Sequence, residues 1–342
     1  MKICLFSNVF FPSIGGIETC SLNLATAWTQ MGHDVLLISY TPAESDYDSR
    51  FPFRVVRSPT DRLWIELLKD RQVLISNGRS MKHLRVWRRA GVPFGWIHAG
   101  AFHDHVRGMR AAASRFMRRM GTRLGSFNIC VSESIKQNVG NDAAVVIYNA
   151  VSPIFRPLNE IKSSGRFLYY GRIWMAKGVD TLLEAMALLR NEGLDCPVDF
   201  IGDGEDMATA HQMAASLRVT DLAYFHPALH GEALVEAINR SLAVIVPSHC
   251  QEAFGLAAAE ALACGKCVIG ALDGGLPEVL GDAALTFSPN DVPALAAHMR
   301  ATWKDPAIAQ KFRQRALDRA KAFSLDAIAR QYIELFESVI AR

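Results

Sequence analysis

The chain has 342 residues, of which 50% are hydrophobic and 21% are charged, and its formal net charge is +3. This length favours two domains, and the composition excludes a disordered chain because it supplies enough apolar residues for two cores. No apolar run reaches the ~18 residues of a membrane span, and seven scattered cysteines are typical of a reducing compartment. We therefore expect a cytoplasmic protein.

Short β-branched or aromatic runs alternate with helix-length stretches along both halves of the chain. The first half has predicted strands at 2–6, 34–39, 53–56, 73–76, 94–98, 127–131 and 144–147. The second half has predicted strands at 167–171, 198–202, 243–246, 267–270 and 284–287. This alternation predicts parallel sheets covered by helices on both faces.

A linker divides the two series of strands. The segment that begins at Val151 contains two prolines and a Ser-Ser-Gly sequence. We expect two doubly wound, Rossmann-like α/β domains, at 1–155 and 165–322, and a closing helix over 323–342 that packs back on the first domain. Ligands of such sheets bind at the carboxyl ends of the strands, so the predicted site is a cleft between the domains.

A pair of glycines, Gly15 and Gly16, follows the first strand and precedes a predicted helix. Glycine lets the backbone approach a ligand, and the amides of a helix N-terminus attract a phosphate. A dinucleotide fingerprint is the rival interpretation, but the G-x-G-x-x-G spacing is absent, as is an acid at the end of the second strand. The alternative is a simple turn in which Glu18 interacts with the helix dipole.

Two cations, Arg172 and Lys177, lie in the loop after the first strand of the second half. An arginine binds two phosphate oxygens as a fork and a lysine neutralises another as a point charge, so the pair suits a diphosphate. The alternative interpretation is a solvated loop with two ordinary cations.

Two glutamates, Glu252 and Glu260, bracket the start of an apolar helix that follows the strand ending near Pro247. The free amides of a helix start attract an anion, and carboxylates accept hydrogen bonds from hydroxyl groups. The two acids thus lie on either side of anion-binding amides, which fits a sugar nucleotide because it has a hydroxyl-bearing ring on each side of a diphosphate. Two alternatives stay open: a helix cap with an ordinary ion pair, or a glycosidase acid pair, which needs roughly 5–10 Å between its carboxyl groups.

The sequence resembles the retaining glycosyltransferases of GT-B architecture that carry an E-x7-E motif (glycosyltransferase family four, glycosyl transferases group one). The resemblance covers nearly the whole chain. Its motifs, in order, are GGIE, GHDV, VSES, YNAV, GRIWMAKGVD, FIGDGE, VPSHCQEAFGLAAAEALACGKCVI, GGLPEV and FSLDAIA. It implies an enzyme that moves a sugar from a nucleotide-sugar donor to a hydroxyl acceptor without a metal or other cofactor, and a UDP-sugar is favoured over a GDP-sugar.

The resemblance also implies a role for particular residues. Arg172 and Lys177 hold the donor diphosphate, and Gly15 and Gly16 approach it from the first domain. Glu252 binds hydroxyl groups of the donor sugar, and Glu260 binds the ribose. The backbone amides of Phe254, Gly255 and Leu256 hold the sugar and the phosphate. His98 lies beside the transferred sugar.

Some positions depart from the family pattern. His226 and Pro227 stand where a glycine is usual near the base pocket, which leaves the identity of the base open. Cys264 and Cys267 have a redox-type spacing, but they join a helix to a strand in the order opposite to that of thioredoxins. The histidines and acid of HAGAFHDH (98–105) resemble metal ligands, but no second cluster completes a site.

A basic stretch marks the first half: between Arg79 and Arg123 there are eleven Arg and Lys residues and a single acid, Asp104. Within it, residues 105–125 mix apolar side chains with arginines, as an interfacial helix does. The stretch predicts docking on an anionic membrane and a lipid-linked or glycan acceptor of lipopolysaccharide, exopolysaccharide or another cell-envelope glycan. The alternative is a solvated helix; nucleic acid is disfavoured, because no DNA-binding motif accompanies the charge.

Two further functions remain open from the sequence. One is a sugar-nucleotide epimerase of the same architecture, which would interconvert donor sugars without an acceptor. The other is a non-catalytic, membrane-associated protein that binds sugar nucleotides. The presence of all four residues favours a transferase, since a protein that only binds sugar nucleotides could have lost some of them: His98, Arg172, Lys177 and Glu252.

Overall fold

The computed structural model describes the chain except residues 14, 44–45, 79, 81, 101–120 and 342. It divides into two compact units. Unit 1 comprises Met1–Ala150 and Leu325–Arg342, and unit 2 comprises Val151–Ser324. The chain passes between the units twice, and the two crossings adjoin, because the Val151 amide donates to the Phe323 carbonyl at 2.8 Å.

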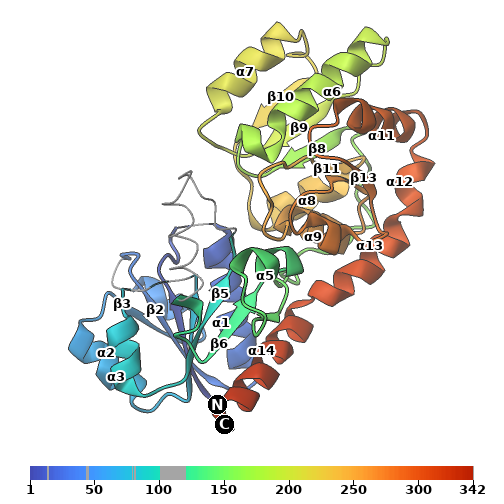
Figure 1. The fold of residues 1–342 in the computed structure, drawn as a ribbon. Helices are drawn as coiled ribbons and strands as arrows, with labels where there is room; N and C mark the ends of the chain where they lie inside the picture. Colours follow the sequence, from blue (N-terminus) through green and yellow to red (C-terminus); the bar gives the residue numbers. More distant parts are fainter. Residues whose placement is uncertain (14, 44–45, 79, 81, 101–120, 342) are drawn as a thin grey trace. The chain divides into compact units, whose positions relative to one another are not determined.

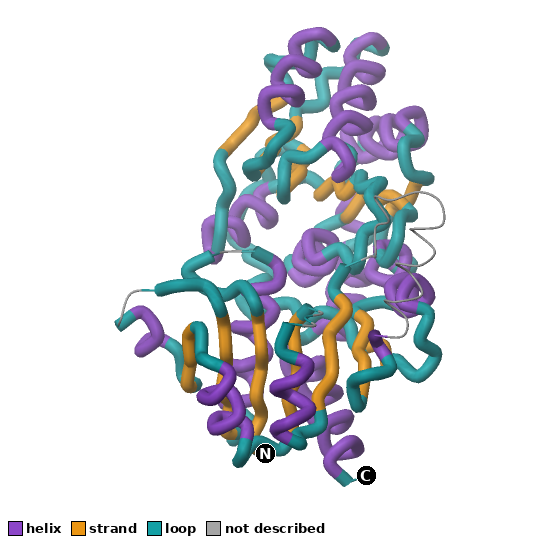
Figure 2. The backbone as a smooth tube through the Cα atoms, turned by 60° about the vertical axis from the view of Figure 1, so that its left-hand side comes forward, coloured by secondary structure: helices purple, strands orange, loops and turns teal. Residues whose placement is uncertain are grey.

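Unit 1 contains a seven-stranded sheet in the order β3-β2-β1-β4-β5-β6-β7, and every neighbouring pair is parallel. Figure 2 shows its strands side by side in one layer. The strands are β1 (Lys2–Ser7), β2 (Asp34–Ser39), β3 (Arg54–Arg57), β4 (Val73–Asn77), β5 (Phe94–His98), β6 (Phe127–Cys130) and β7 (Val145–Val146). The strand order reverses between β1 and β4, so this is the switch point at which such sheets bind ligands.

Helices cover both faces of this sheet (Figure 1). They are α1 (Gly16–Gln30), α2 (Asp61–Leu68), α3 (Leu84–Ala90), α5 (Glu133–Val139) and α14 (Leu325–Ile340). On one face, α2 and α3 bury Trp64 and Trp87 against alternate residues of the strands, such as Phe6 and Trp96. The strands β1, β2, β4 and β5 are buried along nearly their whole length, as expected for a parallel sheet between two helical layers, whereas the edge strands β3 and β7 are partly exposed.

The last helix, α14, packs on α1 within unit 1 (Figure 1). The Trp28 indole of α1 contacts the rings of Tyr332 and Phe336 at 5.6 and 5.5 Å between centroids. Its Nε1–H donates to the Ala329 carbonyl at 3.3 Å. Large buried rings of this kind contribute much of the packing energy between helices, so the end of the chain is an integral part of unit 1.

Unit 2 contains a six-stranded parallel sheet in the order β10-β9-β8-β11-β12-β13. The strands are β8 (Phe167–Tyr170), β9 (Val198–Ile201), β10 (Ala223–His226), β11 (Val244–Val246), β12 (Val268–Ala271) and β13 (Leu285–Phe287). Here the order reverses between β8 and β11. Both units are therefore doubly wound, and the predicted fold class is confirmed.

The helices of unit 2 also lie on both faces of its sheet (Figure 1). They are α6 (Val179–Asn191), α7 (Met207–Ser216), α8 (Gly231–Arg240), α9 (Leu256–Ala263), α10 (Leu276–Leu280), α11 (Val292–Lys304), α12 (Ala307–Lys311) and α13 (Arg313–Ala320). Helices α6 and α11 pack on each other over a core that includes Phe167, Phe200 and Met186. Among the described residues, no helix is both long and apolar enough to span a membrane.

Candidate functional site

Two loops meet at the switch point of unit 2. The first follows β8 and carries Arg172 and Lys177, and the second follows β11 and carries Glu252. Strands β8 and β11 are neighbours at which the strand order reverses, and doubly wound sheets bind their ligands at such a point. The structure thus brings together Lys177 and Glu252, and Arg172 lies on the same loop as Lys177.

The two loops are fastened to each other by their backbones. Lys177 ends a short 3-10 helix (Met175–Lys177), and Gly178 follows it with φ +80°. A Cβ at Gly178 would lie 2.0 Å from the Pro247 carbonyl oxygen, so only glycine fits here. The His249 amide also donates to the Ala176 carbonyl at 3.0 Å. The position of Lys177 relative to the loop after β11 is therefore fixed.

Lys177 and Glu252 form an ion pair across these loops. The Lys177 Nζ lies 2.5 Å from Glu252 Oε2, and the Ser248 hydroxyl donates to the same oxygen at 3.2 Å. Both side chains are partly exposed, at 29% and 15%. An ammonium group beside a carboxylate at a strand end can bind a phosphate through the cation and a hydroxyl group through the carboxylate.

Helix α9 begins next to this pair. Gly255 precedes it with φ +101°, and no side chain caps the helix start. The neighbouring Phe254 is buried and packs edge-on against Phe323, at 5.4 Å between ring centroids. The first amides of α9, from Leu256 onward, point out of the helix and have the partial positive charge that attracts an anion.

Glu260 lies in the second turn of α9 and contacts the last residue of β8. The Tyr170 hydroxyl lies 2.6 Å from the Ala257 carbonyl oxygen and 3.2 Å from Glu260 Oε2. Burial raises the pKa of Glu260 to about 8, although the Tyr170 hydroxyl opposes this shift. A carboxyl group with this pKa changes its charge near neutral pH.

Arg172 is exposed, and its guanidinium group has no hydrogen-bond or acidic partner among the residues that the structure describes. Its backbone is nevertheless anchored, because the Tyr169 hydroxyl donates to the Arg172 carbonyl at 2.7 Å. The guanidinium group is thus available for an anion on the same loop as Lys177.

In unit 1, Gly15 and Gly16 lie at the start of α1, after β1. The Glu18 side chain folds back over this turn, because a Cβ at Gly15 would lie 2.7 Å from Glu18 Oε2. The Ser13 hydroxyl donates to Glu18 Oε1 at 2.9 Å. The interaction of Glu18 with the helix start is therefore present, and a phosphate at this turn stays a prediction.

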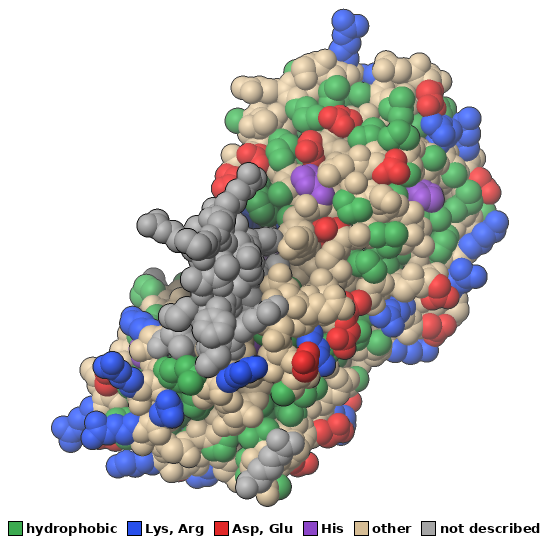
Figure 3. Space-filling view, in the orientation of Figure 1, with side chains coloured by type: hydrophobic (Ala, Val, Ile, Leu, Met, Phe, Trp, Pro, Cys, Tyr) green, Lys and Arg blue, Asp and Glu red, His purple; other side chains and the backbone are tan. Residues whose placement is uncertain are grey.

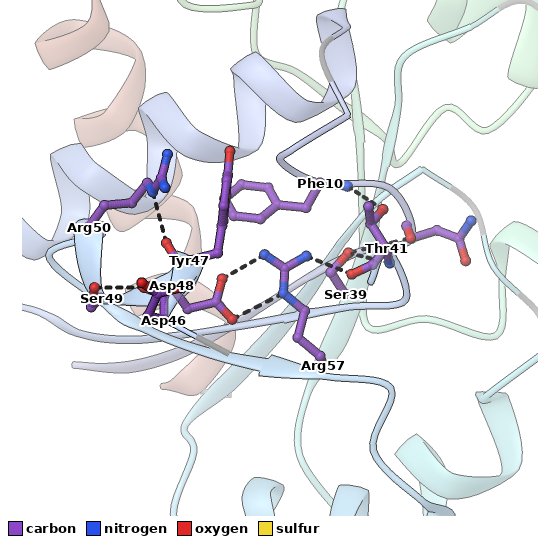
Figure 4. A network of polar contacts seen from close by, with 10 residues as sticks. Phe10, Ser39, Thr41, Asp46, Tyr47, Asp48, Ser49, Arg50 and Arg57 are labelled. Carbon is purple, nitrogen blue, oxygen red and sulfur yellow. Dashed lines mark hydrogen bonds and ion pairs between the residues drawn. The ribbon is translucent and has the colours of Figure 1, made fainter. Parts of the chain in front are cut away.

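A polar network fixes the neighbouring loops of unit 1. Figure 4 shows the Arg57 guanidinium between Asp48 and Thr41. It donates to both Asp48 oxygens at 2.6 and 3.1 Å and to the Thr41 carbonyl at 2.7 Å. The Thr41 hydroxyl in turn accepts from the Phe10 amide at 3.0 Å. These contacts tie the loop after β1 to the ends of β2 and β3.

His98 is the last residue of β5 and is buried. Its Nε2 lies 2.9 Å from Asn128 Oδ1, and Asn128 Nδ2 donates to the Thr122 carbonyl at 2.8 Å. Because the amide nitrogen faces Thr122, the oxygen faces His98, which places a proton on Nε2. The structure confirms the strand-end position of His98, and its role beside a sugar stays a prediction.

Two other motifs of the sequence, the cysteine pair and the histidine-rich segment, are candidates for a second site. Cys264 and Cys267 are buried, and burial raises the pKa of each thiol to about 12, which disfavours the reactive thiolate. His103, Asp104 and His105 of the histidine-rich segment lie outside the described residues, as does most of the stretch 105–125. Within the described ranges, no group of three potential metal ligands is found.

Sequence reasoning missed three residues that contact the predicted ones. Ser248 and Asp273 contact Glu252, and Tyr170 contacts Glu260. Ser248 and Tyr170 stand at or just beyond the ends of β11 and β8, which is a signal for a site residue in a parallel sheet. Asp273 comes directly before a Gly-Gly pair after β12, where a tight turn brings the chain back toward the neighbouring loop.

Family profiles match both halves of the chain. The profile described as Glycosyl transferases group 1 matches residues 152–319, and that described as Glycosyltransferase Family 4 matches residues 14–154. The chain is also similar to a glycogen synthase of Mycobacterium tuberculosis. That protein is 26% identical over 379 aligned positions, which cover 93% of this chain and 90% of the relative.

Solved structures have the same fold. Alr3699/HepE of Anabaena, in complex with UDP and glucose, has a TM-score of 0.82 at 18% identity, over 99% of this chain and 100% of that chain. WaaG, a glycosyltransferase involved in lipopolysaccharide biosynthesis, has a TM-score of 0.73 at 14% identity, over 97% and 99%.

Proposed function

Since the chain belongs to the group 1 glycosyltransferases of family 4, which have the GT-B architecture, we propose that it transfers a sugar from a nucleotide-sugar donor to a hydroxyl acceptor. The observation that carries this proposal is the meeting of Lys177, Glu252 and the uncapped start of α9 at the switch point of unit 2. A cation and helix amides suit a diphosphate, and a carboxylate between them suits the hydroxyl groups of a sugar.

In this proposal each residue has one task. Lys177 and Arg172 bind the diphosphate together with the amides of Phe254, Gly255 and Leu256. Glu252 accepts hydrogen bonds from the donor sugar. Glu260, held by Tyr170, binds the ribose. For three residues of unit 1 the proposal keeps the roles that the family resemblance implies: Gly15 and Gly16 act on the diphosphate, and His98 acts on the transferred sugar.

The proposed reaction retains the configuration of the anomeric carbon. The bond between that carbon and the diphosphate oxygen breaks while a bond to the acceptor oxygen forms on the same face. The acceptor proton passes to the departing diphosphate oxygen. Lys177, Arg172 and the dipole of α9 stabilise the negative charge that develops there, so the reaction needs no metal ion in this mechanism. A UDP-sugar is the preferred donor, with a GDP-sugar second, in line with the UDP and glucose named for Alr3699/HepE.

The proposed acceptor is a glycan or a lipid-linked glycan of the cell envelope, as in lipopolysaccharide or exopolysaccharide synthesis, and WaaG supports this assignment by its similarity. Unit 1 carries 21 basic and 14 acidic residues, a net charge of +7. Four exposed cations on α3 and the turn before it have no acidic partner among the described residues: Lys82, Arg85, Arg88 and Arg89. In Figure 3, Lys and Arg side chains gather over the region of α2 and α3. We propose that they dock on an anionic inner membrane face, with the rest of the stretch 79–123.

The donor assignment is tested by ligand binding and by one substitution. We expect UDP or a UDP-sugar to raise the melting temperature more than GDP or GDP-sugars. Lys177→Ala should lower transfer by about 10²–10³-fold, the effect of removing one preorganised charge partner. Lys304→Ala, which removes an exposed lysine at the end of α11, serves as the control. Normal turnover by Lys177→Ala would refute the phosphate assignment.

Sedimentation with vesicles tests the membrane surface. The triple variant Arg85→Gln, Arg88→Gln, Arg89→Gln should lose binding to vesicles that contain anionic phospholipid at low salt, since each cation near such a surface is worth about 1 kcal/mol. A matched variant that neutralises three exposed cations of unit 2 should retain binding: Lys304, Lys311 and Arg315. Absence of wild-type binding at low salt ends the membrane proposal.

A further inference from the structure

The turn after β12 holds the backbone of Glu252 on both sides. Asp273 Oδ2 accepts a hydrogen bond from the Glu252 amide at 3.0 Å. The Gly275 amide donates to the Glu252 carbonyl at 2.6 Å. Both polar groups of this residue's backbone are therefore bound by a three-residue segment, Asp273–Gly275, that belongs to a different loop.

The sequence of this turn makes the contact possible. Gly274 has φ +55°, and a Cβ there would lie 2.2 Å from the Glu252 carbonyl oxygen and 2.6 Å from its nitrogen. Only glycine allows the two loops to approach so closely. The turn is itself anchored, because the Leu272 amide donates to the Phe287 carbonyl at 2.8 Å and the Leu276 amide donates to the Asp273 carbonyl at 3.0 Å.

The conformational preferences of the loop residues do not by themselves fix the backbone of Glu252. Gln251, directly before it, is exposed and has φ +55°, a left-handed conformation that a residue with a Cβ rarely adopts. Such a conformation persists only where surrounding contacts enforce it. The hydrogen bonds from the turn Asp273–Gly275 are contacts of this kind.

The carboxylate of Glu252 is held on one side only. Lys177 and Ser248 both contact Oε2, whereas Oε1 has no partner among the residues that the structure describes. The position of Oε1 depends on the position of the Glu252 backbone and on the two contacts that hold Oε2. A shift of the Glu252 peptide therefore moves the oxygen that is left for a ligand.

We propose that Asp273 is a positioning residue, which acts on the sugar-binding carboxylate of Glu252 by holding its peptide; this rests on the proposed function. Asp273 is an anion beside a diphosphate site, so direct contact with the diphosphate would be repulsive. Its observed hydrogen bond is to the protein backbone. It thus acts through Glu252 and not on the donor.

The test compares two substitutions, with the nucleotide sugar that raises the melting temperature most as donor, a cell-envelope glycan as acceptor and released nucleoside diphosphate as the readout. Asp273→Ala removes the acceptor for the Glu252 amide and should lower kcat by about 10–100-fold, because small misplacements of a reacting group are costly. The affinity for the nucleoside diphosphate alone should change less than threefold. Asp273→Asn keeps an amide oxygen that accepts from Glu252, so it should retain kcat within threefold. Asp282→Ala, an exposed acid of the same unit, is the matched control.

Each result separates the possibilities. Full activity of Asp273→Ala overturns the positioning role, as does an equal loss of kcat in Asp273→Ala and Asp273→Asn, which would indicate a need for the charge. If Asp273→Ala fails to fold, the Asp273→Asn variant decides alone: wild-type kcat supports the role, and a large loss overturns it. A wild-type protein whose melting temperature is raised by no nucleoside diphosphate and no nucleotide sugar overturns the proposed function itself.

Discussion

The two units have the same doubly wound fold but different chemistry at their switch points. In unit 2, the loops after β8 and β11 present a lysine and a glutamate that contact each other. In unit 1, the segments after β1 and β4 also carry charged side chains, Glu18 in the first turn of α1 and Lys82 before α3, but no contact joins an acid to a cation there among the described residues; the buried contacts at the end of β4 join neutral groups. The Asn77 Nδ2 donates to the Ser21 hydroxyl at 2.8 Å and to the Ile17 carbonyl at 3.1 Å. The switch point of unit 2 thus has an ion pair between its two loops, whereas the contacts of Asn77 in unit 1 join buried neutral groups.

The net charges of the two units do not follow the position of the proposed anion site. Unit 2 carries 16 basic and 20 acidic residues, a net charge of −4, whereas unit 1 has a net charge of +7. The proposed diphosphate site nevertheless lies in unit 2. Two cations at a strand end and a helix start act over a few ångströms, while exposed charges farther away are screened by solvent and salt. The comparison teaches that local geometry, not net charge, indicates the anion site.

The strongest test of this comparison is Glu252→Gln. The substitution keeps the size of the side chain but removes the carboxylate that accepts from sugar hydroxyl groups, so transfer should fall about 10²–10³-fold. It also releases Lys177 from its ion pair. We therefore expect nucleoside diphosphate to bind several-fold more tightly to the variant, as measured by calorimetry.

The control is Glu184→Gln, which neutralises an exposed glutamate on α6 and should change neither quantity. Weaker binding of nucleoside diphosphate by Glu252→Gln would contradict the expectation. It would mean that Glu252 holds Lys177 in the geometry that binds phosphate, and that the ion pair assists the ligand and does not compete with it.

His98→Ala tests the share of unit 1 in the reaction. If His98 lies beside the transferred sugar, its loss should lower transfer by about 10–100-fold, the scale of one polar contact to a reacting group. Binding of nucleoside diphosphate should stay within twofold, because His98 has no proposed contact with the phosphates or the ribose. A loss of nucleotide binding equal to the loss of transfer would contradict this division of labour, and His211→Ala, an exposed histidine of α7, is the control.

The fold could be predicted from the sequence because most strands are short apolar runs between helix-length stretches. The edge strand β10 is not among the predicted strands of the second half: its segment lacks the continuous apolar pattern of the central strands, and Tyr224 is 37% exposed. Helix α9 begins at Leu256, because Gly255 directly before it takes a left-handed conformation.

The charged residues of the site could also be predicted, but their contacts could not. Arg172, Lys177, Glu252 and Glu260 each stand after a strand or at a helix start, which a sequence reveals. The ion pair of Lys177 with Glu252 depends on the close approach of Gly178 to Pro247. Such approaches arise from the packing of loops that are far apart in the sequence, and spacing alone gives no sign of them.

The smallest expected effect is a pH dependence of nucleoside diphosphate binding, caused by the titration of Glu260. Its pKa is raised to about 8 from an ordinary value of 4.5 by burial. If ribose hydroxyl groups donate to its carboxylate, nucleoside diphosphate should bind several-fold more tightly at pH 8.5 than at pH 6.5, since the charged form is the better acceptor. Glu260→Gln should lose this dependence, which separates it from the titration of the phosphate itself. A dideoxy nucleoside diphosphate, which lacks the hydroxyl groups, should show the same loss with the wild-type protein.

The same pKa predicts the stability of the unliganded protein. Between pH 4.5 and about 8 the folded protein keeps a proton on Glu260 that the unfolded chain has released. The free energy of unfolding must then fall as the pH rises through this window, because the folded state binds more protons. The melting temperature of the wild type should decline relative to Glu260→Gln from pH 5 to pH 8 and level off above it. Parallel curves for the two proteins would show that Glu260 is already ionised at neutral pH, and the pH dependence of nucleotide binding would then need another titrating group.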